Sequence, residues 1–168
     1  EIDAKLNKTP LKHFAEFLNK TIYRSIRYSR SAEDYIGRFY GEFMSYSGGD
    51  GQTLGIILTP KHITQLFCDL ADLKKTDVVF DPCCGTAGFL IAAMHNMLAV
   101  AKDDPSQQKS IRRNQLHGIE LRPNMFTIAT TNMILRGDGK SNLINDDFLK
   151  QDPNKLQLKQ STVGMMNP

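Results

Sequence analysis

The sequence lacks the two common glycine-rich fingerprints of phosphate-binding proteins. It contains neither a Gly-x-x-x-x-Gly-Lys-Ser/Thr P-loop nor a Gly-x-Gly-x-x-Gly dinucleotide pattern, which argues against a P-loop nucleotidase and a nicotinamide-dependent dehydrogenase. No apolar run reaches the roughly 20 residues of a membrane span, and the first residues show no charged-then-apolar signal pattern. We therefore expect a cytoplasmic protein without a membrane partner.

Cysteine is also scarce, with only Cys68 and the adjacent pair Cys83 and Cys84. Adjacent cysteines are poorly placed for a disulfide, and no Cys-x-x-Cys pattern indicates a zinc site. We expect reduced thiols that act neither as nucleophiles nor as metal ligands. The formal net charge of +3 at pH 7 says little by itself about binding to nucleic acid.

One stretch organises the rest of the chain. Residues 78–80 are apolar and β-rich, which predicts a buried parallel strand, and the apolar residues 89–100 predict a buried helix. Between them, Gly85 and Gly88 permit a tight turn and let the backbone approach a ligand. Ligands of such sheets bind beyond the carboxyl ends of the strands. Asp81 stands at that place, and an acid suits a ligand with a cationic amine or sulfonium, such as S-adenosylmethionine (SAM).

The same arrangement recurs along the chain. A second strand is predicted over residues 116–121, a third starts at residue 143, and a fourth covers residues 162–166. Each predicted strand, the first included, ends at a polar side chain, and these are Asp81, Glu120, Asp147 and Asn167. We expect all four to line one edge of a parallel sheet, where the acid after the second strand can bind both hydroxyls of a ribose.

The remaining elements are predicted from caps and periodicity. Thr59 is a good N-cap with Pro60 in the first helical position, and the apolar side of that helix is expected at Ile63, Leu66, Phe67 and Leu70. Residues 102–115 are polar and predict a surface loop with a short helix. A further helix is expected to begin at Pro123 and to end at Gly137.

Two regions are expected. Residues 1–47 are predicted to be the end of a helical domain, too small to bury much apolar surface alone. The glycine-rich residues 48–51 are the predicted boundary. Residues 48–168 are predicted to form an α/β domain.

The ordered motifs resemble those of adenine-specific DNA methyltransferases of the amino-methylating class, and most of all the modification subunit of type I restriction-modification systems. The resemblance spans roughly residues 34–168. It is carried by Thr59-Pro60, Asp81-Pro82-Cys83-Cys84-Gly85-Thr86-Ala87-Gly88-Phe89-Leu90, Gly118-Ile119-Glu120, Asn145-Asp146-Asp147-Phe148 and Asn167-Pro168, the last similar to the start of the Asn-Pro-Pro-Tyr/Phe signature. Leu58 stands where the family often has an aromatic residue. Ala87 stands where it often has glycine, at little cost if the backbone angle is ordinary.

The resemblance implies an α/β fold of the Rossmann-like, SAM-dependent methyltransferase type, with a truncated parallel sheet in strand order 3-2-1-4 preceded by a small helical segment. It implies SAM as cofactor without a metal. The implied cofactor-binding residues are Thr59, Pro60, Asp81, Pro82, Gly85, Thr86, Gly88, Phe89, Glu120, Leu121, Asp147 and Phe148. The implied catalytic residues are Asn167 and Pro168, which would accept hydrogen bonds from the target amine.

The family roles follow residue by residue. Asp81 and the glycine-loop backbone would hold the amino-acid end of SAM, with Thr59 and Pro60 bordering it. Glu120 would bind the ribose. Leu121, together with Asp147 and Phe148 in the segment after the third strand, would contact the adenine of the cofactor.

The implied partners are double-stranded DNA and a specificity subunit, with a restriction subunit as a further candidate. A type I subunit and a fused restriction-methylation polypeptide both remain open. So do methylation of RNA, protein glutamine or another planar amine, and a non-catalytic SAM-binding or assembly module. Because the chain ends two residues into the catalytic signature, we expect it to bind SAM but not to methylate DNA on its own.

Overall fold

The computed structural model describes residues 9–24, 37, 39, 42, 58–138, 142–152 and 160–168. The chain divides into two compact units, Glu1–Arg30 and Ser31–Pro168. The domain boundary predicted after residue 47 lies outside the described residues and stays a prediction.

The described part of the first unit is helical. The helix α1 (Pro10–Phe17) has proline in its first turn and Thr9 as N-cap, whose hydroxyl accepts the backbone N–H of Lys12 at 3.3 Å. It continues into η1 (Leu18–Tyr23), where the turns widen to π-helical spacing. No side chain of either helix is buried.

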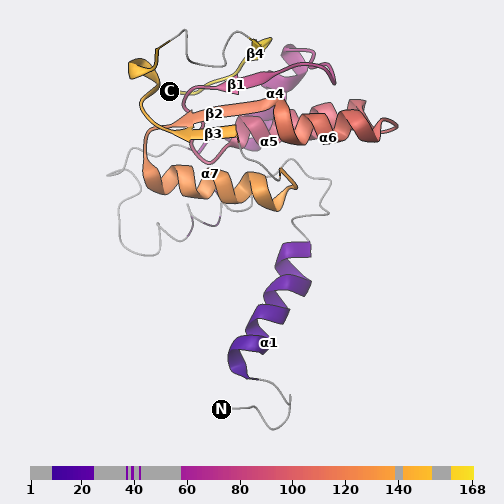
Figure 1. Ribbon diagram of the computed structural model, residues 1–168, viewed down its shortest axis with the longest axis vertical. Coiled ribbons are helices and arrows are strands. Elements are labelled where there is room, and N and C mark those ends of the chain that lie inside the picture. Colours follow the sequence, from indigo (N-terminus) through magenta and orange to yellow (C-terminus); the bar gives the residue numbers. More distant parts are fainter. Residues whose placement is uncertain are drawn as a thin grey trace. The chain divides into compact units, whose positions relative to one another are not determined.

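The second unit is built on a parallel sheet in the order β3-β2-β1-β4, as predicted. The strands are β1 (Val79–Asp81), β2 (Leu116–Glu120), β3 (Asn142–Asn145) and β4 (Val163–Gly164). In β1, Val79 pairs with Leu116 on one side and with Val163 on the other. Figure 1 shows the strands side by side, with α7 running along β3.

The helices of this unit are α4 (Lys61–Leu70), α5 (Gly88–Val100), α6 (Pro105–Asn114), α7 (Pro123–Leu135) and the short 3-10 helix η2 (Phe148–Lys150). The core forms around α5, which is apolar on nearly all sides and packs against β1, β2, α4 and α6. In β2, Gly118 makes this packing possible. A Cβ there would lie 2.8 Å from a methyl of Leu143 and 3.0 Å from one of Leu90.

Helix α4 differs from its prediction in two ways. Its N-cap is Pro60, whose carbonyl accepts the N–H groups of Ile63 and Thr64, so the predicted cap was placed one residue too early. The predicted apolar side was wrong, because the buried side chains are Thr64 and Cys68, while Leu66, Phe67 and Leu70 are exposed. Thr64 lies beside the start of α5, where a Cβ added to Gly88 would be 3.9 Å from its Cγ2, an ordinary van der Waals distance. Phe67 also contacts α5, through Phe89, although it stays 40% exposed.

The predicted loop over residues 102–115 is mostly the ten-residue helix α6. Asp104 caps it by accepting the N–H of Gln107 at 3.0 Å, and Pro105 occupies the first turn. Ile111 is fully buried and ties α6 to the core. The helix α7 ends at Leu135 with Arg136 as its C-cap, and Gly137, the glycine predicted to end it, follows with a φ of 90°. No helix in the described ranges has the length and apolarity that crossing a membrane requires.

Candidate functional site

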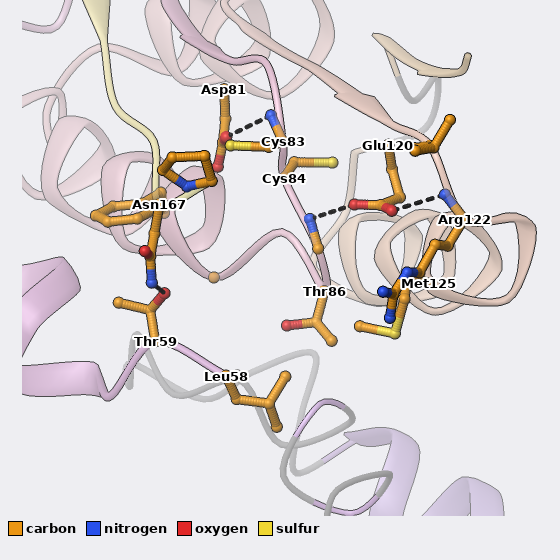
Figure 2. Close-up of a pocket in the computed structure, with 15 residues that line it drawn as sticks. Leu58, Thr59, Asp81, Cys83, Cys84, Thr86, Glu120, Arg122, Met125 and Asn167 are labelled. Carbon is orange, nitrogen blue, oxygen red and sulfur yellow. Dashed lines mark hydrogen bonds between the residues drawn. The ribbon is translucent and has the colours of Figure 1, made fainter. Parts of the chain in front are cut away.

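The carboxyl ends of β1 and β2, the segment after β4 and the residues before α4 enclose an open pocket of about 290 Å³ (Figure 2). This is near the lower limit for small-molecule sites. The pocket is lined by Leu58, Thr59, Asp81, Cys83, Cys84, Gly85, Thr86, Gly88, Phe89, Glu120, Leu121, Arg122, Met125, Asn167 and Pro168.

The glycine loop forms the floor at the end of β1. Asp81 is 1% exposed, and its Oδ1 accepts the backbone N–H of Cys83 at 3.1 Å. Gly85 has a φ of 55°, which glycine adopts without steric cost. Ala87 has a φ of 70° just before α5, so its backbone angle is not ordinary, and the alanine adds strain. From α7, the buried Asn132 donates to the Thr86 carbonyl at 3.0 Å and fixes the loop.

Glu120 joins the end of β2 to this loop. Its Oε2 accepts the N–H of Gly85 and its Oε1 accepts the N–H of Arg122, both at 2.8 Å (Figure 2). The residue is 7% exposed. Each carboxylate oxygen has room for a second hydrogen bond. Glu120 therefore holds the loop in place and keeps acceptor capacity for hydroxyl groups entering the pocket.

The electrostatics of the pocket favour a cation. Burial, and to a smaller extent the negative charge of Glu120, raise the pKa of Asp81 from 3.8 to about 7, against the lowering effect of the hydrogen bonds with Cys83. A cationic group beside Asp81 would stabilise the ionised carboxylate, both against its desolvation and against the repulsion by Glu120. A buried acid in a cleft whose pKa is shifted by desolvation and by a neighbouring charge is typical of functional sites.

The two cysteine thiols in the pocket are held in their neutral form. Burial, together with the charge of Asp81, raises the pKa of Cys83 to about 11 and raises that of Cys84 as well. The reactive form of cysteine is the thiolate, so these thiols are poor nucleophiles near neutral pH. Within the described ranges, no three His, Cys, Asp or Glu side chains cluster as a metal site would require.

Asn167 lines the pocket from the segment after β4. It follows β4, and its amide Nδ2 donates to the hydroxyl of Thr59 at 3.1 Å (Figure 2). The structure thus brings together three of the four polar strand-end residues, Asp81, Glu120 and Asn167, with Thr59 beside the last.

The fourth strand-end residue, Asp147, does not line the pocket, and neither does Phe148. Asp147 caps η2 by accepting the N–H of Leu149 at 3.0 Å, and the ring of Phe148 lies 5.9 Å from that of Phe80. Pro60 and Pro82 do not line it either. A cofactor role for these four residues stays a prediction.

The sequence interpretation did not include Leu58, Cys83, Cys84, Arg122 and Met125 among the binding residues, yet all of them line the pocket. Arg122 and Met125 lie three residues apart at the start of α7, where a helix places neighbouring side chains on one face. Their position shortly after Glu120, the acid at the end of β2, was the sequence feature that could have indicated them as pocket residues.

Comparison with known proteins identifies the family. Residues 31–168 match the family model described as N-6 DNA Methylase. The chain belongs to the N-6 DNA methylase family. The parallel sheet, with its pocket at the carboxyl edge, is the Rossmann-like methyltransferase fold expected from the sequence.

Known restriction enzymes and methylase subunits are similar to this chain. Over 99% of its length the chain is 48% identical to the type II restriction enzyme and methyltransferase RM.BcgI of Heyndrickxia coagulans, covering 26% of that protein. It is 27% identical over 96% of its length to the type I restriction enzyme EcoEI methylase subunit of Escherichia coli, covering 32%. The crystal structure of the EcoKI M protein superposes with a TM-score of 0.59 at 26% identity, over 66% of this chain and 24% of that one. This N-6 DNA methylase chain therefore spans about a quarter to a third of its relatives.

Proposed function

We propose that the complete protein containing this chain transfers a methyl group from SAM to the exocyclic amine of adenine in double-stranded DNA, as part of a restriction-modification system. The observation that carries the proposal is the convergence of Asp81, Glu120 and Asn167 on one pocket in a chain of the N-6 DNA methylase family. Each of these residues stands where a strand ends, as the family resemblance implies.

The residues at the pocket fit SAM. Asp81 supplies a buried carboxyl next to a second acid, which suits the cationic amino group of the cofactor. Glu120 lines the pocket with acceptor capacity left for ribose hydroxyls. Leu121 and Met125 supply apolar surface for an adenine ring. When bound, SAM supplies an already activated methyl group, so the protein needs no metal or covalent step for the transfer.

Asn167 and the carbonyl of Pro168 are the proposed acceptors for the target amine. The lone pair of adenine's exocyclic nitrogen is delocalised into the ring, which makes the amine a poor nucleophile. Two acceptors on its hydrogens favour a pyramidal nitrogen and direct the lone pair towards the methyl group, and in-line placement supplies much of the rate. Because the amine is paired inside a duplex, the target base must be flipped into the pocket.

We further propose that the chain comes from a polypeptide that combines restriction and methylation, rather than from a separate type I methylase subunit. The chain is 48% identical over 99% of its length to RM.BcgI, a type II restriction enzyme and methyltransferase, against 27% over 96% for the type I EcoEI methylase subunit. Duplex DNA is the substrate, and a specificity subunit is the expected partner. A separate restriction subunit is needed only if cleavage is absent from the polypeptide itself.

Methyl transfer from tritiated SAM tests the proposal directly. The full-length protein with its DNA-reading partner should label adenine-containing duplex DNA, and chromatography of the hydrolysed DNA should place the label on N6 of adenine. Asn167→Ala should abolish labelling, while Asn114→Ala, an exposed asparagine outside the pocket, should leave it intact. Label in RNA, in protein glutamine or on another amine would replace adenine DNA as the substrate. SAM binding without any transfer would instead favour a binding or assembly module.

A further inference from the structure

We propose that Thr59 is a positioning residue for Asn167. Its hydroxyl accepts a hydrogen bond from the Asn167 amide and holds that amide with its oxygen available to the target amine. The inference rests on the proposed function, and it assigns to Thr59 a role beyond bordering the cofactor. The two residues are 108 positions apart in the sequence, and both line the pocket, with 3.1 Å between Nδ2 and Oγ1 (Figure 2).

The chemistry requires the amide to be held in one orientation. An asparagine side chain has a donor end and an acceptor end, and the target amine brings only N–H donors to it. Asn167 therefore has to present Oδ1. Binding Nδ2 to Thr59 occupies the donor end and leaves Oδ1 for the substrate. Asn167 is exposed and follows the two-residue strand β4, so burial does not restrict its side chain.

Thr59 is well placed to act as the anchor. It precedes Pro60, whose ring fixes its own φ at −60° and confines the preceding residue to extended backbone. The Pro60 carbonyl accepts the N–H groups of Ile63 at 2.9 Å and Thr64 at 3.2 Å, which ties this point to the start of α4. The hydroxyl is thus attached to a regular helix, which positions a functional group more accurately than a loop does.

The helix is in turn fixed to the glycine loop. Phe67 of α4 and Phe89 of α5 pack with ring centroids 5.2 Å apart, and α5 starts directly after the loop. The hydrogen bond to Asn167 therefore joins the base-facing side of the pocket to the element that is proposed to hold the cofactor. Loss of the hydroxyl should misplace the acceptor without removing it.

The test uses the full-length protein with its DNA-reading partner. Thr59→Val removes the hydroxyl and keeps the side-chain shape, Thr59→Ser keeps the hydroxyl, and Thr127→Val is the matched control. Thr127 is exposed on α7, and its hydroxyl donates to the Pro123 carbonyl at 2.9 Å, outside the pocket. Two quantities are measured: the single-turnover rate of methyl transfer to adenine duplex DNA at saturating SAM, and the calorimetric affinity for S-adenosylhomocysteine.

The expected result is a rate lowered about 10- to 100-fold in Thr59→Val, the scale of a misplaced catalytic contact, with the affinity changed less than about threefold. Thr127→Val should stay close to the wild-type rate, and Thr59→Ser, which keeps the hydroxyl, should recover most of the rate that Thr59→Val loses. If Thr59→Val fails to fold, as judged by its melting temperature, Thr59→Ala takes its place in the comparison with Thr59→Ser.

Three outcomes would overturn the inference. An unchanged rate in Thr59→Val, or an affinity loss whose effect disappears at saturating SAM, would leave Thr59 at most a cofactor contact. An equal loss in Thr59→Ser would assign the effect to side-chain shape rather than to the hydroxyl. A wild-type complex that binds S-adenosylhomocysteine but transfers no methyl group would instead refute the proposed function itself, which is a separate readout.

Discussion

The strands β1 and β3 both run into acidic residues, yet those acids meet very different surroundings. Asp81, the last residue of β1, is buried and lines the pocket, with its pKa raised by burial. Asp146 and Asp147 after β3 lie outside the pocket, and backbone and side-chain hydrogen bonds from residues 147–151 satisfy them locally. In the sheet order, β1 lies between β2 and β4, whereas β3 has β2 alone as its described neighbour.

This comparison shows that an acid at a strand end is not sufficient to make a site. The chain after β1 turns through the glycine loop into α5, and the loop together with the start of α5 lines the pocket. The chain after β3 enters the short helix η2, and Asp147 is used as its cap. The next element along the chain decides whether the acid lines a pocket or serves as a helix cap.

The largest expected effect concerns the pH dependence of stability. Since the folded-state pKa of Asp81 is about 7 and its ordinary value is 3.8, the folded state binds the proton more tightly. Stability should therefore fall as the pH rises from about 4 to about 7 and then level off. Asp81→Asn cannot ionise, so its advantage in free energy of unfolding over wild type should grow by about 3–4 kcal/mol between pH 4 and pH 8. Urea unfolding at both pH values measures this.

Asp146→Asn is the control from the other strand end. The pKa of Asp146 is lowered, chiefly by the hydrogen bond from the Gln151 side chain. Its ionised carboxylate therefore stabilises the folded state at neutral pH, and this stabilisation is lost as the pH falls below about 4. The two variants should thus show pH dependences of opposite sign. If the stability of both variants relative to wild type changed in the same direction with pH, the difference between the acids of β1 and β3 would be contradicted.

The next effect concerns cofactor affinity. Glu120→Ala should weaken binding of S-adenosylhomocysteine by about 1–3 kcal/mol, because it removes a buried pocket-lining acceptor and leaves the partly buried N–H groups of Gly85 and Arg122 without it. Asp147→Ala should weaken it less than about threefold, since Asp147 does not line the pocket. Titration calorimetry on both variants checks this. Equal losses would support the role in adenine binding that the family resemblance implies for Asp147.

The glycine loop offers a smaller test. Gly85→Ala should lower the free energy of unfolding by about 1–2 kcal/mol, the cost of a left-handed angle for a residue with a Cβ. No atom lies within 4 Å of the added Cβ, so steric contact adds nothing. Ala87→Gly should change stability by less than about 1 kcal/mol, because relief of the left-handed angle is offset by a more flexible unfolded chain. Chemical unfolding of both variants measures the difference, and a large gain for Ala87→Gly would show greater strain in the loop.

The smallest expected effect is at the cysteines. Because burial and the neighbouring acid raise the pKa of Cys83 to about 11, Cys83→Ser combined with Cys84→Ala should keep methyl transfer within about threefold of wild type. The assay uses the full-length protein with tritiated SAM. Loss of transfer with cofactor affinity intact would give one of the thiols a role in the chemistry.

The strand, glycine loop and helix around Asp81 were predictable from the sequence because the signals are local. A short β-rich run, two glycines and an apolar run specify a turn within about a dozen residues. The placing of Glu120 beside the loop followed from the rule that the carboxyl ends of parallel strands meet at one edge, whereas the strand order of the sheet was implied by the family resemblance. The loop and the position of Glu120 thus depend on neighbours in the chain or on a general property of parallel sheets.

Other features depended on the tertiary structure. The residues that α4 buries are Thr64 and Cys68, and this follows from how α4 packs on α5, which periodicity alone did not show. Asp147 stays outside the pocket because the chain after β3 enters η2, which uses Asp147 as its cap. The hydrogen bond between Thr59 and Asn167 joins residues 108 positions apart. Local propensity determines turns and caps, whereas pairings between distant side chains are decided by how α4 and β4 pack around the same core.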